Sequence, residues 1–193
     1  MASPRLVLVR HGATEWSVSG QHTGVTDIPL TDEGRRAAEA LGDRLAGREY
    51  AIVLVSPLSR ARDTAELAGF GDRAQVEADL RELDYGEYEG RTTTAIREER
   101  PGWSVWRDGS PGGEPLEHAA GRAEHAIARA LGSGGDALIF AHAHILRVLT
   151  ARWLELPPLY GGNLPLGTAA VCELGYERER RAIWGWNDQC HLR

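Results

Sequence analysis

The sequence predicts an α/β fold with three layers (αβα), in which a mostly parallel central sheet carries helices on both faces. Three short runs, at residues 6–9, 51–55 and 136–141, are apolar throughout except for Asp136 at the start of the third, which is typical of strands buried on both faces. Each run is followed by a segment whose apolar residues recur every three or four positions, as in a helix packed on one side. This alternation favours a parallel sheet, because parallel strands need a crossover connection, which is usually helical.

The expected helices have recognisable starts and ends. Thr31 is a suitable N-cap for a helix that runs to about residue 46, with two acids in its first turn, where the helix dipole favours them. The Ser56-Pro57 pair predicts the start of the next helix, because proline suits the first helical position, and Gly69 ends that helix. Helical spacing predicts three more helices, at residues 92–99, 118–132 and 145–154.

Shorter apolar runs predict three further strands, at residues 75–78, 168–174 and 182–186. The segment 102–115 is rich in Gly, Pro and Trp, which indicates an irregular stretch that could act as a lid. The sequence contains no internal repeat and no linker-like segment. We therefore expect a single domain over residues 1–193.

Composition excludes several classes of function. The chain of 193 residues has a net charge of −6 and no basic tract, so nucleic acid is not expected as a partner. All 22 basic residues are arginines, which excludes a Schiff-base lysine or a P-loop lysine. The two cysteines form no metal or redox motif. The first strand starts too early for a signal peptide and no apolar run is long enough to span a membrane, so we expect a cytoplasmic protein.

Two of the predicted strands end in histidine, at His11 and at His142. If both strands are central and parallel, both imidazoles lie at the carboxyl edge of the sheet, where α/β proteins bind ligands. Arg10 precedes His11, and Arg60 falls in the first turn of the helix after the second strand. Two arginines and two histidines around one point suit a dianion such as a phosphoryl group. His11 is then the candidate nucleophile, and Glu82 the candidate general acid.

Six segments, in order, resemble the histidine phosphatase superfamily, which has the phosphoglycerate mutase-like fold. The first is Arg10-His11-Gly12-Ala13-Thr14-Glu15-Trp16, which is similar to the RHG signature of that family. The likeness covers nearly the whole chain. The other segments are Thr23-Gly24 with residues 27–31, residues 56–61 with Thr64-Ala65, residues 80–86 with Glu89-Gly90, Gly112-Gly113-Glu114, and Phe140-Ala141-His142.

The resemblance implies a role for each matching catalytic residue. His11 would become phosphohistidine. Glu82 would protonate the leaving group and then act as base for the attacking water. Arg10, Arg60 and His142 would hold the phosphoryl group.

The resemblance also implies which residues bind the rest of the substrate. Thr23 and Gly24 would line the mouth of the site. Ser17 stands where the family often has asparagine, so it would be a shortened phosphate donor. Ala143 replaces a usual glycine but could still contact phosphate through its backbone N–H. Pro115 replaces a usual serine and removes a hydroxyl and an N–H.

The expected activity is hydrolysis of phosphomonoesters, as in a broad-specificity acid phosphatase. The acidic residues at 84–90 would repel the carboxylate of a phosphoglycerate, which disfavours mutase action. A cofactor-dependent phosphoglycerate mutase and an inactive relative that binds phosphorylated ligands remain as alternatives. Trp103 and Trp106 in the lid hint at an apolar or aromatic leaving group.

Neither a metal nor another cofactor is expected. His142 and His144 lie two residues apart, which on a strand would place both on one face, but no third ligand has a suitable spacing. The expected partner is a small phosphorylated molecule, and the expected assembly is a monomer or a dimer.

Overall fold

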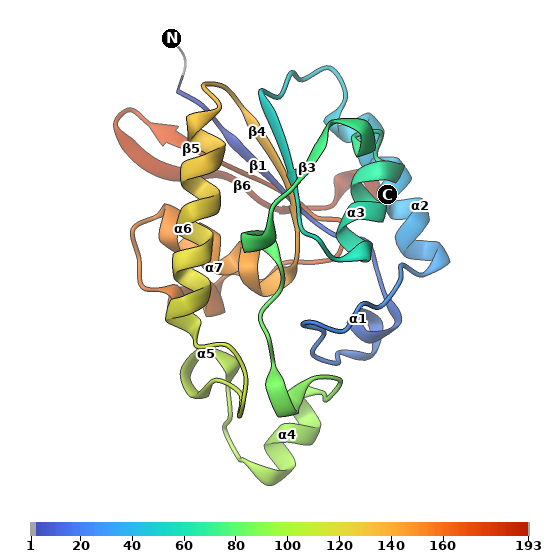
Figure 1. Ribbon diagram of the computed structural model, residues 1–193, viewed down its shortest axis with the longest axis vertical. Coiled ribbons are helices and arrows are strands. Elements are labelled where there is room, and N and C mark those ends of the chain that lie inside the picture. Colours follow the sequence, from blue (N-terminus) through green and yellow to red (C-terminus); the bar gives the residue numbers. More distant parts are fainter. Residues whose placement is uncertain (1–2, 193) are drawn as a thin grey trace.

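The computed structural model describes residues 3–192, and its centre is one six-stranded sheet in the order β3-β2-β4-β1-β5-β6 (Figure 1). The pairs β3–β2, β2–β4 and β4–β1 are parallel, whereas β1–β5 and β5–β6 are antiparallel. The sheet is therefore mostly parallel, as predicted. The strands are β1 Leu6–Arg10, β2 Ile52–Val55, β3 Ala74–Val76, β4 Ala137–Ala141, β5 Val171–Glu177 and β6 Arg180–Asp188.

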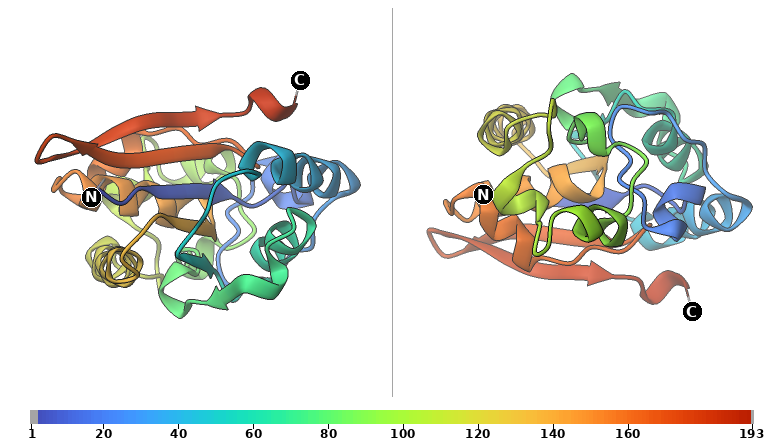
Figure 2. Two further views of the ribbon diagram at one scale, coloured as in Figure 1. Left: turned by 90° about the horizontal axis from the view of Figure 1, so that it is seen from above. Right: turned by 90° about the horizontal axis from the view of Figure 1, so that it is seen from below.

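Helices cover both faces of this sheet, which confirms the three-layer α/β architecture (Figure 2). The pair α6 and α7 lies on one face, and α2 and α3 lie on the other. The short helices α1, α4 and α5 lie beyond the carboxyl ends of the parallel strands (Figure 1). The helices are α1 Glu15–Ser19, α2 Asp32–Leu45, α3 Ser59–Leu67, α4 Thr93–Glu99, α5 Val105–Asp108, α6 Leu116–Gly132 and α7 Ala143–Trp153.

The continuous apolar character of the central strands follows from this arrangement. In β1, Leu6 and Leu8 point into the core under α6 and α7, whereas Val7 and Val9 belong to the core under α2 and α3. All four side chains are buried, because alternate residues of a strand face opposite sides of the sheet and both sides are covered. The register that pairs Arg10 with Ala141 brings the ends of β1 and β4 level, so His11 and His142 leave the sheet side by side.

The predicted cap of α2 is confirmed, whereas the predicted start of α3 is wrong. The Thr31 hydroxyl accepts the N–H of Gly34 at 3.0 Å. Helix α3 starts at Ser59 rather than at Pro57, and its N-cap residue Leu58 has no capping side chain. Its first N–H instead donates to the carboxylate of Asp27, at 3.0 Å. This cap comes from 32 residues away, so no local pattern could reveal it.

Other boundaries differ by a few residues. The strand predicted at 75–78 is β3, at Ala74–Val76. Of the two closing strands, β5 has the predicted length but starts three residues later, and β6 is longer than predicted; the two form a hairpin. Helix α7 begins at Ala143, so His144 lies in its first turn and not on a strand. Trp184 is 53% exposed, because β6 is an edge strand.

Candidate active site

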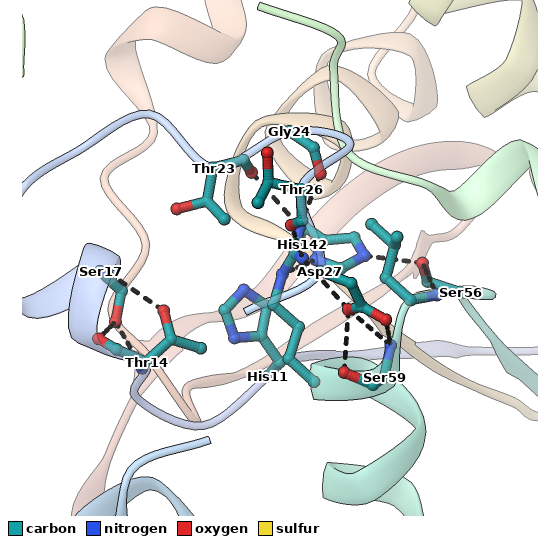
Figure 3. Close-up of polar contacts among 12 residues, drawn as sticks. His11, Thr14, Ser17, Thr23, Gly24, Thr26, Asp27, Ser56, Ser59 and His142 are labelled. Atoms are coloured by element: carbon teal, nitrogen blue, oxygen red, sulfur yellow. Dashed lines mark hydrogen bonds and ion pairs between the residues drawn. The ribbon is translucent and has the colours of Figure 1, made fainter. Parts of the chain in front are cut away.

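His11 lies directly after β1 and presents one ring nitrogen for chemistry (Figure 3). Its Nδ1 lies 2.7 Å from the carbonyl oxygen of Gly12. A carbonyl can only accept, so Nδ1 carries the proton and Nε2 keeps its lone pair. The side chain is almost fully buried, and its ring centre is 5.1 Å from that of His142. This tautomer is the one that a histidine nucleophile needs.

The surroundings of His11 keep its ring neutral. Burial lowers its pKa well below the usual value, and the nearby His142 and Arg10 lower it further. The lone pair on Nε2 is therefore available throughout the mildly acidic range.

Arg10 is the strongest candidate for holding a phosphoryl group. One guanidinium nitrogen donates to the carbonyl of Leu166 at 2.6 Å. Its Nε is buried and has no hydrogen-bond partner among the described residues. Burial lowers the pKa of Arg10 to about 10, so the group remains a cation at neutral pH. A buried donor without a partner costs free energy that an anion bound beside it would recover.

The contacts of Arg60 in this structure are with protein atoms. Its guanidinium is fully buried, and its terminal nitrogens donate to the carbonyls of Thr23, Gly24 and Thr26 at 3.0–3.3 Å. Its Nε donates to Nδ1 of His142 at 3.1 Å. In this structure, Arg60 therefore fixes the loop over the site and the second histidine, and its donors face protein atoms rather than the pocket.

We expect Arg60→Met to destabilise the fold. The change removes the donor of one buried and two partly buried carbonyls, and a buried group without a partner costs about 1–3 kcal/mol. The melting temperature should fall by several degrees, and activity should fall with it. Arg62→Met is the matched control, because Arg62 lies on the exposed face of the same helix. Equal melting temperatures for the two variants would contradict the structural role of Arg60.

His142 is also committed to protein partners. Its Nδ1 accepts from Arg60, so Nε2 carries the proton and donates to the Ser56 hydroxyl at 2.6 Å (Figure 3). Burial and the charge of Arg60 lower its pKa to about 3, so the ring is neutral. The ring is fully buried, and the adjoining Ala143 lines the pocket in its place.

The pocket beside His11 has a volume of about 200 Å³. It brings together six of the predicted site residues: Arg10, His11, Ser17, Thr23, Glu82 and Ala143. It leaves out Arg60, His142 and Gly24, which lie behind its wall. A larger hollow of about 550 Å³ beside β3 contains none of the histidines.

Hydrogen bonds and packing within the protein account for the serine at position 17 and the glycine at position 24 without any contact to a substrate. The Ser17 hydroxyl accepts from the Thr14 N–H and donates to the Thr14 carbonyl, and Thr14 caps α1 in return. The Gly24 N–H donates to the Glu89 carboxylate at 2.8 Å. A side chain at Gly24 would come within 2.3 Å of the Leu83 carbonyl, which accounts for the glycine.

The acidic loop does not face the pocket as the sequence analysis suggested. The Glu89 carboxylate accepts from the N–H groups of Gly24 and Thr26, and that of Asp84 accepts from the N–H of Gly86. These acids hold turns together, so they give no argument against a substrate carboxylate.

Glu82 lies against the N-terminus of α7. Its two carboxylate oxygens accept the backbone N–H groups of His144, Ile145 and Leu83 at 2.9–3.0 Å. Burial alone raises its pKa, but the His144 side chain, 3.8 Å away, and the backbone N–H groups that donate to the carboxylate lower the pKa by more. Glu82 is therefore ionised here, so the proton for the leaving group has to be taken up when the substrate binds.

One wall of the pocket is lined by aromatic and imidazole rings, and it was not predicted from the sequence. His22 lies 4.8 Å from Tyr85 between ring centres, and Trp106 stacks on His144 at 5.1 Å. The guanidinium of Arg147 lies 4.4 Å over the Trp106 ring. Arg147 lies one helical turn after His144, so the predicted helix could have suggested it. The additional lining residues are Gly20, Gln21, His22, Tyr85, His144, Arg147 and Leu166.

Residues 6–189 match the model of the histidine phosphatase superfamily (branch 1). The chain belongs to this superfamily. An acid phosphatase of Mycobacterium tuberculosis is 43% identical over 183 residues, which cover 93% of this chain and 90% of that protein. A probable phosphoglycerate mutase of Salmonella choleraesuis is 30% identical over 192 residues, which cover 94% and 89%.

A solved structure shows the same fold. The product of a Mycobacterium tuberculosis open reading frame superimposes with a TM-score of 0.91 at 42% sequence identity. The match covers 95% of this chain and 97% of that one. The phosphoglycerate mutase-like fold expected from the resemblance is therefore confirmed.

No three His, Cys, Asp or Glu side chains between residues 3 and 192 gather as a metal ion would require. In the same range, no helix is both long and apolar enough to cross a membrane.

This histidine phosphatase should lose stability as the pH falls below about 6.5. Burial is the largest cause of a lowered pKa in His11, His22, His142 and His144. A histidine in the unfolded chain titrates near pH 6.5, so the unfolded chain takes up these protons at a higher pH than the native protein does. Proton uptake lowers the free energy of the unfolded chain relative to the native state. Below about pH 4.5, Glu82 acts in the same direction, because its native pKa is also lowered. A melting temperature that stays constant from pH 7.5 to pH 5 would contradict this.

Proposed function

We propose that this chain is a phosphomonoesterase that works through a phosphohistidine on His11, with the broad specificity of an acid phosphatase. The observation that carries the proposal is the tautomer of His11, whose Nε2 lone pair lies in the same pocket as Arg10 and Glu82. The nucleophile, the cation and the acid–base group are thus together in one small space.

The geometry supports a two-step reaction. Glu82 takes up a proton as the substrate binds. Nε2 of His11 then attacks phosphorus, the ester P–O bond breaks, and the leaving oxygen takes that proton from Glu82. A water molecule then attacks the phosphohistidine while Glu82 takes its proton, and the N–P bond breaks to release phosphate. Arg10 and the backbone N–H of Ala143, at the N-terminus of α7, stabilise the charge on the phosphoryl oxygens. The small, ring-lined pocket suits a small phosphorylated molecule.

Hydrolysis is favoured over the two alternatives. The acid phosphatase relative is more similar to this chain than the probable mutase, at 43% against 30% identity. A protein that only binds phosphate needs no carboxylate at the site, because an ionised Glu82 repels the anion.

Two assays separate the candidate activities. We expect the purified protein to release phosphate from p-nitrophenyl phosphate and from several alkyl phosphates. A phosphoglycerate mutase assay, with the bisphosphoglycerate primer present, should give a lower rate than hydrolysis. Phosphate binding without turnover of any ester would instead support the inactive relative.

Metal removal should leave the activity unchanged, because positive charge at the site comes from arginines and backbone N–H groups. The measurement is phosphate release before and after dialysis against EDTA. A loss of activity that zinc or magnesium restores would overturn the metal-independent mechanism.

The predictions of a monomer or dimer and of a cytoplasmic location remain part of this proposal. Light scattering on the purified protein tests the first, and fractionation of the source cells tests the second.

A further inference from the structure

One histidine at the pocket has no part in the mechanism described so far. His144 lines the pocket from the first turn of α7, and its backbone N–H already holds Glu82. Its side chain is also directed toward Glu82, since Nδ1 lies 3.8 Å from the carboxylate oxygen Oε2. The same nitrogen lies 2.7 Å from the hydroxyl of Tyr85. The ring of His144 thus joins a phenol to the acid–base carboxylate.

The ring of His144 is held in place on several sides. Trp106 stacks on its face, and the Tyr85 ring meets it edge-on at 5.6 Å. The stack fixes the ring but leaves Nδ1 directed at its two oxygen partners. The charged and titratable groups that surround it are Glu82 and Tyr85 from the segment between β3 and α4, His22 from the loop after α1, Arg10 at the end of β1, and Arg147 on α7 itself.

We propose that His144 is a positioning residue that shares with Glu82 the proton handed to the leaving group. This inference rests on the proposed phosphatase function. Glu82 alone is a poor store for that proton, because three backbone N–H groups stabilise its ionised form. An imidazole beside it can carry the proton as a cation and form an ion pair with the carboxylate.

The Tyr85 hydroxyl allows the ring to change its charge. Burial raises the pKa of Tyr85 well above its usual value, so the hydroxyl keeps its proton. It can donate to Nδ1 when the ring is neutral and accept from Nδ1–H when the ring is charged, since a hydroxyl does both. Both protonation states of His144 therefore have a partner.

Each proton that moves in the proposed reaction has a donor and an acceptor. The entering phosphoryl dianion favours uptake of one proton, which His144 holds on Nδ1. As the ester P–O bond breaks, its electron pair stays on the leaving oxygen, which takes a proton from Glu82, and Glu82 takes the proton from His144. When water attacks the phosphohistidine, Glu82 accepts the proton of that water, so the pair regains what it gave. The Nδ1–Oε2 distance has to shorten in the substrate complex, as contacts of general acids commonly do.

The test compares two substrates that differ in their need for a proton. The phenolate of p-nitrophenyl phosphate leaves unaided, whereas the alkoxide of glycerol 2-phosphate must be protonated. In His144→Gln we expect kcat/KM for glycerol 2-phosphate to fall roughly tenfold or more, and that for p-nitrophenyl phosphate by less than about threefold. The alkaline limb of the glycerol 2-phosphate profile should move to lower pH. Tyr85→Phe should change the ratio in the same direction but by less.

His22→Gln is the matched control, because His22 is in the same ring-lined wall but its Nε2 faces the Thr93 hydroxyl. Whatever it does to the overall rate, it should leave the ratio of the two substrates within about twofold. An equal loss on both substrates in His144→Gln, or no loss on either, would overturn the role of His144. Failure of the wild-type protein to hydrolyse p-nitrophenyl phosphate would instead overturn the proposed function. If His144→Gln does not fold, the ratio in Tyr85→Phe decides.

Discussion

His11→Ala should abolish the hydrolysis of every phosphomonoester, with a loss of roughly 10⁴-fold or more in kcat/KM. The reason is that alanine offers no lone pair to phosphorus, and the other buried histidine, His142, has both ring nitrogens bonded to protein groups. The loss should be in turnover rather than in phosphate binding, because Arg10 keeps its place. The measurement is steady-state kinetics together with inorganic phosphate binding by calorimetry.

A trapped intermediate gives the second half of this test. Wild-type protein mixed with radiolabelled substrate and quenched in alkali should carry label that is stable to base and labile to acid, whereas the His11→Ala variant should carry none. His118→Ala is the control, because His118 is exposed on α6 and contacts Glu114 rather than the pocket. Full activity in His11→Ala would show that the phosphoryl group never passes through this ring.

Glu82→Gln should give the second largest effect, and its size should depend on the leaving group. General acid–base catalysis contributes about 10²–10⁴-fold, so alkyl phosphate hydrolysis should fall by that factor. The loss on p-nitrophenyl phosphate should be smaller, because only its second step needs the base. Glutamine keeps the shape, and its one carbonyl oxygen can still accept from the N–H groups of Leu83 and Ile145. Only the His144 N–H loses its acceptor, so the fold should survive. An equal rate for the variant and the wild type on alkyl phosphates would exclude Glu82 as acid and base.

The pH dependence of the hydrolysis rate gives an independent test of the role of Glu82. Because the pKa of Glu82 is lowered in this structure, the proton needed for alkoxide departure is scarce above the acidic range. The substrate itself takes up a proton near pH 6 and can bring it to the site. Activity on alkyl phosphates should therefore fall as the pH rises above about 6. In wild-type protein, kcat should keep its alkaline limb at a higher pH than kcat/KM, since the bound dianion raises the pKa of Glu82. A rate that keeps rising above neutral pH would contradict this assignment.

Local patterns were enough for the elements that form the frame of the site. The apolar runs before His11 and His142 are buried on both faces of the sheet. A strand that is covered on both faces needs an apolar side chain at every position, and this can be recognised in the sequence directly. The Thr31 cap depends only on residues three apart, so it could be predicted as well. The start of α3 could not, because its first N–H is capped by Asp27 from a distant loop.

The sequence by itself determined the order of the six strands and of five helices along the chain, and the family. It also named the candidate nucleophile at the end of β1 and the candidate acid–base carboxylate. These properties depend on short-range spacing and on which functional groups are present. Only the tertiary structure decided which atoms each group faces. The donors of Arg60 can bind a phosphate or three backbone carbonyls, and the packing of residues 23–26 over α3 selects the carbonyls. In the same way, His144 gains its place beside Glu82 only when the segment after β3 crosses the N-terminus of α7. The partner of a side-chain hydrogen bond does not recur at a regular spacing along the sequence. It therefore follows from the tertiary fold and not from the pattern of residue types.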